Sequence, residues 1–515
     1  VDPDGKTTRV IVTPGDCHLP SDLSTWGWAV QLYAARSRES WGIGDLADLG
    51  ALARWSAGQG AGMMLVNPLH AALPLEDGQQ PSPYFPSSRA FRNPIYLRVE
   101  GEPPDAVAAL NDDRRIDRNA VYKLKMEALA LQWRRFCDAG GDERFEAFRR
   151  ELGASLEAYA TFCALTETHG VDWRTWPEAV RTPTSPGVAP FAADGADRIS
   201  FHAWLQWLLD LQLAEAGEQV GMVQDLAIGC DPAGADAWMW QDAFAEGFSV
   251  GAPPDEFNQA GQDWGLPPFD PWKLRSAAYQ PFIETVRAGF RHAGGLRFDH
   301  VMGLFRLYWI PRDAEGGAVD GAYVRYPSSD LLDILALESV RAGGWVVGED
   351  LGTVQDEVRA ALRERNVLSY KLLWFESQPP REWPEQAFGA ITTHDLPTIA
   401  GLWTGSDLER QRDAGVEPNE ESTEELRSKV QRWTGIDDDA PVDEVVERAH
   451  GLLAEAPCRV VTATVEDALC VEERPNQPGT TVESNWSIAL PVTIEVLMET
   501  ERAAHIARTL DSRSG

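Results

Sequence analysis

Short apolar runs alternate along the chain with longer stretches in which apolar residues recur at helical spacing. Eight of these runs have the length and the flanking residues of buried strands. They cover residues 28–34, 62–68, 221–228, 295–301, 344–351, 370–375, 389–395 and 459–465. Helical patterns separate most of them, at 45–58, 201–217, 275–293, 328–342, 354–365 and 440–454.

Strands that alternate with helices form βαβ units, whose strands run parallel in one sheet. Eight such units predict a closed (β/α)8 barrel, which occupies about 250 residues before insertions. Because the chain has 515 residues, we expect large insertions at about 74–200, 247–272 and 404–440. The first contains helical patterns at 119–137 and 142–168, the second is a loop rich in Gly and Pro, and the third is acidic and helical.

Residues 26–515 are therefore predicted to form the barrel domain. Residues 1–25 are interpreted as the remnant of an N-terminal β region or as a linker. The segment "TTRVIVTP" at 7–14 resembles the end of a β segment, and the chain starts at Val1. We expect a further N-terminal portion to precede it.

The charge composition argues against nucleic acid and membranes as partners. Lys and Arg total 46 against 80 Asp and Glu, a net charge of −34, which repels nucleic acid and anionic membranes. The six cysteines form no CxxC pair, and no window approaches the ~18 apolar residues of a membrane helix, so we expect a cytoplasmic protein. Twenty tryptophans give weak support for sugar binding, since core packing explains them equally well.

Charged residues interrupt the fourth apolar run, "GLRFDHV", which contains Arg297, Asp299 and His300. A buried, unpaired charge costs several kcal/mol. Acidic residues also end the fifth strand, at Glu349, and the seventh, at Asp395 next to His394. Barrel enzymes place their chemistry at these strand ends, so three carboxylates at one rim favour a reactive site over structural capping.

Several carboxylates without a metal-like cluster suit glycosyl transfer. One carboxylate attacks the anomeric carbon, and a second, protonated, donates to the leaving oxygen. A third can stabilise the cationic transition state. Arg297 shares a strand face with Asp299 and should keep it ionised, whereas the apolar neighbours of Glu349 should raise its pKa.

Long motifs now point to a known family. "LRFDHVMGLFRLYWIP", "VVGEDLGTV" and "TTHDLPT" resemble signatures of 4-α-glucanotransferases of the amylomaltase type, glycoside hydrolase family 77 in the α-amylase clan. "ESWGIGDLADL", "SPYFPSSRAFRNPIYL", "VGAPPDEFNQAGQDWGLPPFDP" and "NQPGTTVESNW" extend the resemblance over about residues 26–490. The pattern is similar to the longer bacterial members, which often carry an extra N-terminal β domain.

The resemblance implies roles for the three carboxylates. Asp299 would be the nucleophile, Glu349 the general acid/base and Asp395 the stabiliser of the transition state. The substrate-binding residues that it implies are Arg297, His394, Tyr84, Ser82, Trp264, Gln262, Asp255 and Asn476. Of these, Tyr84 would be a stacking platform, the Asp255–Trp264 loop would cover the acceptor side, and Asn476 would close the donor side.

Simpler interpretations stand beside several of these motifs. Asp45 in "GIGDLADLG" could cap a helix or contact sugar, and Tyr84 and Trp264 could anchor Pro-rich loops. Many relatives read "RIDHFRG" where this chain has "RFDHVMG", so Val301 and Met302 replace an aromatic and a basic residue. We expect oligosaccharide contacts near Met302 to differ.

The expected activity is transfer of α-1,4-glucan segments from one maltooligosaccharide to the 4-hydroxyl of another glucan or of glucose, with retention. Maltodextrin or glycogen metabolism would be the setting, with no cofactor and no metal, no nucleic-acid or membrane partner, and a homodimer left open. Two alternatives remain at this point: an amylase-like α-1,4-glucan hydrolase with the same carboxylates, and a non-catalytic glucan-binding barrel.

Overall fold

The computed structural model describes residues 10–254, 261–313, 315–352 and 354–514. Its centre is a closed barrel of eight parallel strands, in the order β1-β14-β13-β12-β11-β8-β5-β2. These are the eight predicted strands, so the (β/α)8 prediction is confirmed. The bounds are β1 Thr25–Val30, β2 Met63–Val66, β5 Gly221–Leu226, β8 Gly295–Phe298, β11 Trp345–Gly348, β12 Val367–Leu372, β13 Ala387–Ala390 and β14 Val460–Thr464.

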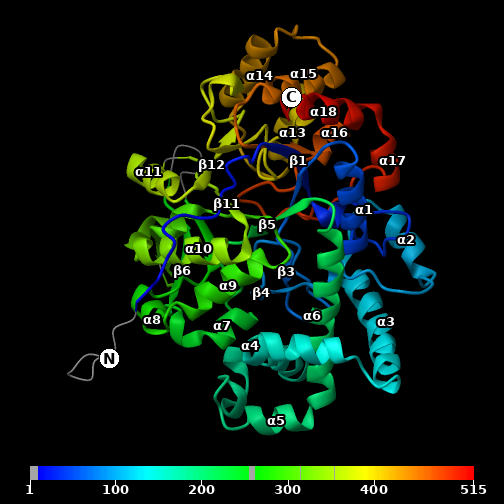
Figure 1. The fold of residues 1–515 in the computed structure, drawn as a ribbon, viewed down its shortest axis with the longest axis vertical. Helices are drawn as coiled ribbons and strands as arrows, with labels where there is room; N and C mark the ends of the chain where they lie inside the picture. Colours follow the sequence, from blue (N-terminus) through cyan, green and yellow to red (C-terminus); the bar gives the residue numbers. More distant parts are fainter. Residues whose placement is uncertain (1–9, 255–260, 314, 353, 515) are drawn as a thin grey trace.

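Helices surround the barrel and follow most of its strands (Figure 1). Those predicted between strands are α1 Leu46–Ala57, α6 Ala196–Ala216, α8 Pro271–Ser276, α9 Gln280–Phe290, α10 Ser328–Ala342, α11 Asp356–Glu364 and α15 Val442–Ala454. The prediction of a single helix at 275–293 is wrong. The structure has two helices, α8 and α9, separated at Ala278 and Tyr279, whose φ angles are positive at 56° and 60°.

The first and third insertions are helical, as predicted. The first holds α2 Ala106–Asp112, α3 Arg118–Asp138, α4 Glu143–His169 and α5 Val188–Asp194, of which α3, α4 and α5 lie together with α6 at one end of the molecule (Figure 1). The third holds α13 Ser406–Asp413 and α14 Glu420–Thr434. The remaining helices are α7 Ala235–Met239, α12 Ile399–Thr404, α16 Val465–Ala468, α17 Ile494–Glu499 and α18 Glu501–Asp511.

The second insertion, predicted as a loop, contains two strands, so that prediction is wrong. These strands, β6 Phe248–Ala252 and β7 Gln262–Leu266, join β9 Arg306–Pro311 and β10 Ala322–Arg325 in an antiparallel sheet of order β10-β9-β6-β7. A small hairpin, β3 His70–Ala71 and β4 Ser88–Arg92, completes the strands. Glycine helps the larger sheet to form: a Cβ on Gly251 would lie 1.9 Å from the carbonyl oxygen of Gln262.

The tryptophans mainly fill the interior. Thirteen of the twenty are buried, among them Trp26 and Trp28 of β1, which are 1% and 0% exposed. The high tryptophan count therefore reflects core packing more than sugar binding. In the part of the chain that the structure describes, no helix is long and apolar enough to cross a membrane.

Residues 10–24 run along the barrel ahead of β1 and contain neither helix nor strand. They are tied to the body of the fold, since the backbone N–H of Cys17 donates to the carbonyl of Arg365 at 2.9 Å. The side chain of Cys17 is buried in an apolar cluster with the α9, α10 and α11 helices.

Candidate active site

The backbone ladder of the barrel fixes two of the predicted carboxylates. Asp299 follows β8 directly, and its N–H donates to the carbonyl of Leu226 at the end of β5, at 3.1 Å. Glu349 follows β11, and its N–H donates to the carbonyl of Phe298 at 2.9 Å. Because Gly348 pairs with Phe298, Asp299 and Glu349 occupy neighbouring positions on neighbouring strands.

The third carboxylate, Asp395, lies in the loop after β13. Its side chain is 44% exposed, so it faces the open mouth of the barrel. The amide of Asn476 donates to Asp395 Oδ1 at 2.7 Å, and His394 Nε2 lies 3.4 Å from Asp395 Oδ2. The backbone carbonyl of Asp395 accepts from Arg474 Nη1 at 3.0 Å, which holds the loop against the segment after β14.

Arg297 pairs with two carboxylates. Its Nη1 lies 3.0 Å from Asp299 Oδ1, as expected for residues on one strand face, and 2.7 and 2.8 Å from the two oxygens of Asp225. Asp225 is in β5, next to β8 in the barrel, and was not singled out in the sequence. The sequence feature that could have indicated Asp225 is an acidic residue inside the apolar run "VQDLAI". Arg297 and Asp299 of the fourth strand are therefore paired, and a neighbouring strand supplies a second carboxylate for Arg297.

Tyr84 lies beside Asp225 and His394. Its hydroxyl donates to Asp225 Oδ2 at 2.6 Å and lies 3.3 Å from His394 Nδ1. Its ring is 4.8 Å from that of His394 and 5.4 Å from that of Trp486, another residue to which no role was given from sequence. Ser82 has a local contact, since its Oγ accepts from the N–H of Tyr84 at 3.3 Å.

The β6–β7 hairpin approaches the site through Trp264. The indole ring packs edge-on against His300, with ring centroids 5.3 Å apart, and its Nε1 donates to Gln262 Oε1 at 3.0 Å. The hairpin therefore contacts His300, the residue that follows Asp299. Asp255 falls outside the described residues.

Burial changes the ionisation of the two carboxylates at the strand ends. Burial raises the pKa of Glu349 above its ordinary value, and Arg297 and the N–H groups of Leu351 and His300 offset only part of this effect. Burial also raises the pKa of Asp299, to about 6; the like charges of Asp225 and Glu349 add to this shift, and Arg297 and His394 offset only part of it. Arg297 does favour the ionised form of Asp299, as expected, but the net shift of the Asp299 pKa is upward.

His394 and Asp395 shift one another in opposite directions. Burial lowers the pKa of His394, but the charge and hydrogen bond of Asp395, together with the charge of Asp225, outweigh it and the net shift is upward. For Asp395, desolvation works toward a higher pKa, and His394 and Asn476 together reverse this, so the pKa is lowered. The pair therefore favours an imidazolium beside a carboxylate.

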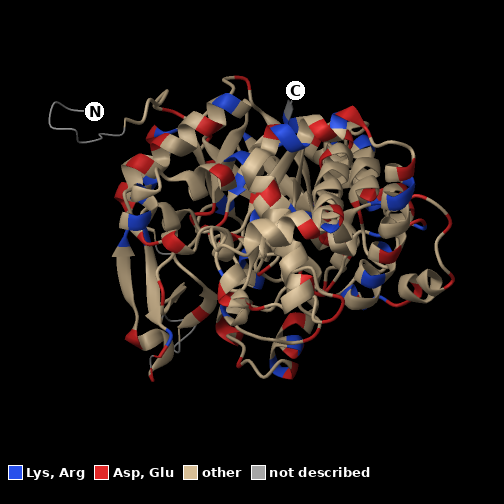
Figure 2. Ribbon diagram, turned by 90° about the horizontal axis from the view of Figure 1, so that it is seen from below, with Lys and Arg blue, Asp and Glu red and all other residues tan. Residues whose placement is uncertain are grey.

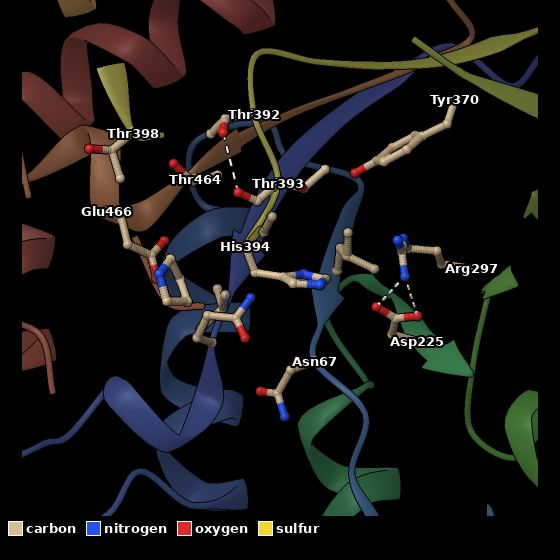
Figure 3. Close-up of a pocket in the computed structure, with 15 residues that line it drawn as sticks. Asn67, Asp225, Arg297, Tyr370, Thr392, Thr393, His394, Thr398, Thr464 and Glu466 are labelled. Carbon is tan, nitrogen blue, oxygen red and sulfur yellow. Dashed lines mark hydrogen bonds and ion pairs between the residues drawn. The ribbon is translucent and has the colours of Figure 1, made fainter. Parts of the chain in front are cut away.

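A cavity lies beside Arg297, Asp225 and His394, and its lining does not include Asp299, Glu349 or Asp395 (Figure 3). Figure 3 shows Arg297 and Asp225 on one side of His394 and Glu466 on the other. Polar groups from several strand ends form the walls: Gln31, Asn67, Tyr370, Thr392, Thr393, Thr398 and Thr464. Among the residues that the structure describes, no group of three or more His, Cys, Asp or Glu is arranged to hold a metal ion.

One of the alternative interpretations is now decided. Asp45 is the N-cap of α1, accepting from the N–H groups of Ala47 and Asp48 in a capping box, so it is structural. Met302 is 8% exposed and packs in an apolar cluster, and the expected difference in oligosaccharide contacts near it stays a prediction.

The known proteins that this chain resembles are described as 4-alpha-glucanotransferases. A family model described as 4-alpha-glucanotransferase, glycoside hydrolase family 77, matches residues 30–493. A 4-alpha-glucanotransferase of Mycobacterium tuberculosis is 42% identical, over 98% of this chain and 78% of the relative. One of Haemophilus influenzae is 32% identical, over 96% of this chain and 80% of the relative.

Solved structures agree. The crystal structure of amylomaltase from Corynebacterium glutamicum superposes with a TM-score of 0.83 at 34% identity, covering 97% of this chain and 77% of that one. Amylomaltase from Streptococcus agalactiae in complex with acarbose gives a TM-score of 0.77 at 17% identity over 94% and 98% of the two chains, a likeness of fold.

Proposed function

Since the chain belongs to glycoside hydrolase family 77 and is a 4-α-glucanotransferase, we propose that Asp299, Glu349 and Asp395 carry out its glucan transfer. The reaction moves an α-1,4-glucan segment from a maltooligosaccharide donor to the 4-hydroxyl of another glucan or of glucose. The single observation that supports the assignment is the register that places Asp299 and Glu349 side by side at the ends of β8 and β11.

In the first half of the reaction, Asp299 attacks the anomeric carbon and Glu349 donates a proton to the departing glycosidic oxygen. Neighbouring strands lie about 4.8 Å apart. This spacing favours the short carboxyl separation of retaining enzymes, about 5–5.5 Å, over the longer separation of inverting ones. The raised pKa of Glu349 keeps the proton available.

In the second half, Glu349 removes the proton from the 4-hydroxyl of the acceptor, which displaces Asp299 from the anomeric carbon. Two displacements restore the α configuration. Asp395, oriented by His394 and Asn476, would bind hydroxyls of the sugar and offset the positive charge of the transition state.

The remaining residues would form the walls of the substrate groove. Tyr84 would present its ring to the sugar, with its hydroxyl fixed by Asp225. Trp264 and Gln262 of β7, with Asp255 of the preceding segment, would receive the acceptor, and Asn476 would close the donor side. Ser82 would act indirectly by ordering the turn at Tyr84.

Incubation with pure maltotriose tests the activity. We expect glucose and a ladder of longer oligomers at a constant number of reducing ends, because each transfer breaks one glycosidic bond and forms another. Rising reducing ends with glucose and maltose alone would indicate a hydrolase. Binding without turnover would indicate a glucan-binding barrel. No cofactor is added in this assay, and activity that required one would contradict the mechanism.

We also propose maltooligosaccharides, longer α-1,4-glucans and glucose as the substrates that this chain uses. A cytoplasmic location, a homodimer and a place in maltodextrin or glycogen metabolism stay predictions from the sequence. Fractionation of the native host, and light scattering of the purified protein, would test the first two.

A further inference from the structure

Residues 475–486, in the segment that follows α16, form a loop that closes on itself beside the candidate site. The backbone N–H of Trp486 donates to the carbonyl of Pro475 at 2.8 Å, so the two ends of the loop touch. Inside the loop, the side-chain oxygen of Asn485 accepts from the N–H of Gln477 at 2.9 Å, and its amide donates to the carbonyl of the same residue at 3.3 Å. The loop is therefore ordered by its own hydrogen bonds.

Both ends of this loop contact the segment that carries His394 and Asp395. Near the first end, the backbone N–H of Asn476 donates to the carbonyl of His394 at 3.0 Å, and its side-chain amide donates to Asp395 Oδ1 at 2.7 Å. At the other end, the indole ring of Trp486 lies 5.1 Å from the ring of His394, centroid to centroid. The loop therefore contacts both the backbone and the ring of His394.

The ring of His394 belongs to a cluster of three aromatic rings. Its centroid is 4.8 Å from that of Tyr84 and 5.1 Å from that of Trp486, and the latter two are 5.4 Å apart. These separations are typical of packed aromatic pairs. Trp486 is 6% exposed, and the buried ring of Tyr33 lies edge-on to it at 6.4 Å. The position of the indole ring is therefore set on more than one side.

The hydrogen bonds of His394 hold its ring only weakly. Nε2 lies 3.4 Å from Asp395 Oδ2, and Nδ1 lies 3.3 Å from the hydroxyl oxygen of Tyr84. Both separations exceed the about 2.7–3.2 Å of an ordinary N–H···O bond. The orientation that points Nε2 at Asp395 therefore depends on how the ring is packed, and Trp486 supplies part of that packing.

The backbone of Trp486 is held in an unfavourable conformation. Its φ angle is 59°, which is unusual for a bulky residue and costs free energy. Its carbonyl accepts from Arg118 Nη2, and Arg118 Nη1 donates to Ser487 Oγ at 3.2 Å. Arg118 is buried, and among the described residues no carboxylate is paired with it. A strained residue fixed by a buried, unpaired cation indicates that the place of this indole ring matters.

We propose that Trp486 is a positioning residue of the active site, whose indole ring fixes the orientation of the His394 ring and thereby keeps His394 on Asp395. Contact between Trp486 and the substrate is not required. The consequence for turnover rests on the proposed function of Asp395, but the effect on the place of the His394 ring does not.

The first test is Trp486→Leu, which keeps an apolar side chain and removes the ring. Transfer from maltotriose should fall about ten- to hundredfold in kcat/KM, the effect of losing two aromatic contacts. The loss should lie mainly in kcat, because Asp395 would act in the transition state. Trp486→Phe, which keeps an aromatic ring, should restore part of kcat. A loss confined to KM would contradict the proposal.

Trp133→Leu is the matched control for the loss of buried packing. Trp133 of α3 is 8% exposed, and its ring also packs in an aromatic cluster, 5.6 Å from that of Phe136 and 5.7 Å from that of Trp204. Both Leu variants should lower Tm. At a temperature well below the lower Tm, only Trp486→Leu should lose kcat. Equal losses of kcat in the two variants would overturn the inference.

A double-mutant cycle tests whether Trp486 acts through His394. In the His394→Gln background, Trp486→Leu should lower kcat/KM by less than about threefold, because the ring that it positions is already absent. Trp133→Leu should have the same small effect in both backgrounds. If Trp486→Leu kept its full effect in the His394→Gln background, Trp486 would act independently of His394 and the proposal would fail.

A crystal structure of Trp486→Leu gives a readout that requires no turnover. We expect the His394 ring to be displaced, with Nε2 no longer within hydrogen-bonding distance of Asp395. A His394 ring in its original place would overturn the inference even if activity were lost. A wild type without disproportionation would instead contradict the proposed function and leave the crystallographic result to decide the positioning role.

Discussion

The three carboxylates of this site differ in how readily they ionise, because their surroundings differ. Glu349 has apolar neighbours and two backbone donors, whereas Asp299 shares an arginine with Asp225. Asp395 is half open to solvent and is flanked by a histidine and an amide. Three acids of similar intrinsic strength can therefore serve as nucleophile, proton donor and stabiliser in one reaction.

Removing the proton of Glu349 should stop transfer while leaving the nucleophile intact. For Glu349→Gln we expect kcat on maltotriose to fall about 10²- to 10⁴-fold, the usual contribution of general acid–base catalysis. With α-maltosyl fluoride, whose leaving group needs little protonation, a maltosyl-enzyme should accumulate and be visible by intact mass. Asp299→Asn should give no such adduct. An adduct in Asp299→Asn would place the nucleophile elsewhere.

The pH profile should report the same two groups. In the proposed roles Glu349 is protonated, so activity should be lost as pH rises through its raised pKa, and Asp299 is ionised, so activity should be lost as pH falls through its raised pKa. Because the two carboxylates interact, the limbs of kcat/KM belong to the pair. Glu349→Gln, assayed with the fluoride donor, should lose the alkaline limb and keep the acid limb near its wild-type position, because Glu349 is already neutral at the pH where Asp299 titrates. An alkaline limb that persists in this variant would contradict the assignment of Glu349.

Strands with continuous apolar runs were predictable from sequence, and partly exposed strands were not. All eight barrel strands were found because each is buried and flanked by helical patterns. The sheet of β6, β7, β9 and β10 was missed because its strands are partly exposed and three of them contain Gly or Pro. Asp225 was missed for a related reason, since its importance comes from pairing with Arg297 on another strand.

Helix α1 depends on an ion cluster at its first turn. Arg98 contacts the carboxylates of Asp45 and Asp48, both of which are about 1% exposed. Arg98→Met should lower the free energy of unfolding by about 3–5 kcal/mol, because it leaves buried charge unpaired. Urea unfolding at pH 7 measures this, with Arg448→Met, which breaks an exposed pair with Glu444, as a control of little effect. Equal effects of the two variants would contradict a structural role for the cluster.

The β6–β7 hairpin should govern the choice of acceptor. In Trp264→Ala we expect the KM for glucose as acceptor to rise about three- to tenfold, from the loss of ~0.5–1.5 kcal/mol of aromatic contact, and hydrolysis to increase relative to transfer. Product ladders and reducing ends from maltotetraose with added glucose measure both. Trp272→Ala, which removes a 75% exposed indole from α8, should behave as wild type. An unchanged partition in Trp264→Ala would remove the acceptor role.

The molecule as a whole carries far more acid than base. Figure 2 shows Asp and Glu positions distributed over the helices and loops, not gathered in one patch. With a net charge of −34, mutual repulsion destabilises the folded state, and salt screens it. We expect Tm at pH 7.5 to rise between 20 mM and 0.5 M NaCl. Near the calculated pI of about 4.6 the rise should vanish. An equal rise at both pH values would point to ion exclusion instead of screening.

Closure of the barrel joins distant parts of the chain, since β1 at residues 25–30 pairs with β14 at residues 460–464. During synthesis on the ribosome, β1 therefore cannot pair with β14 until more than four hundred further residues have been made. Until then the unfinished sheet exposes the free edges of β1 and β13, which are templates for pairing with other chains. The nascent enzyme is both inactive and prone to aggregate over this interval, so chaperones that cover strand edges should matter most for its yield.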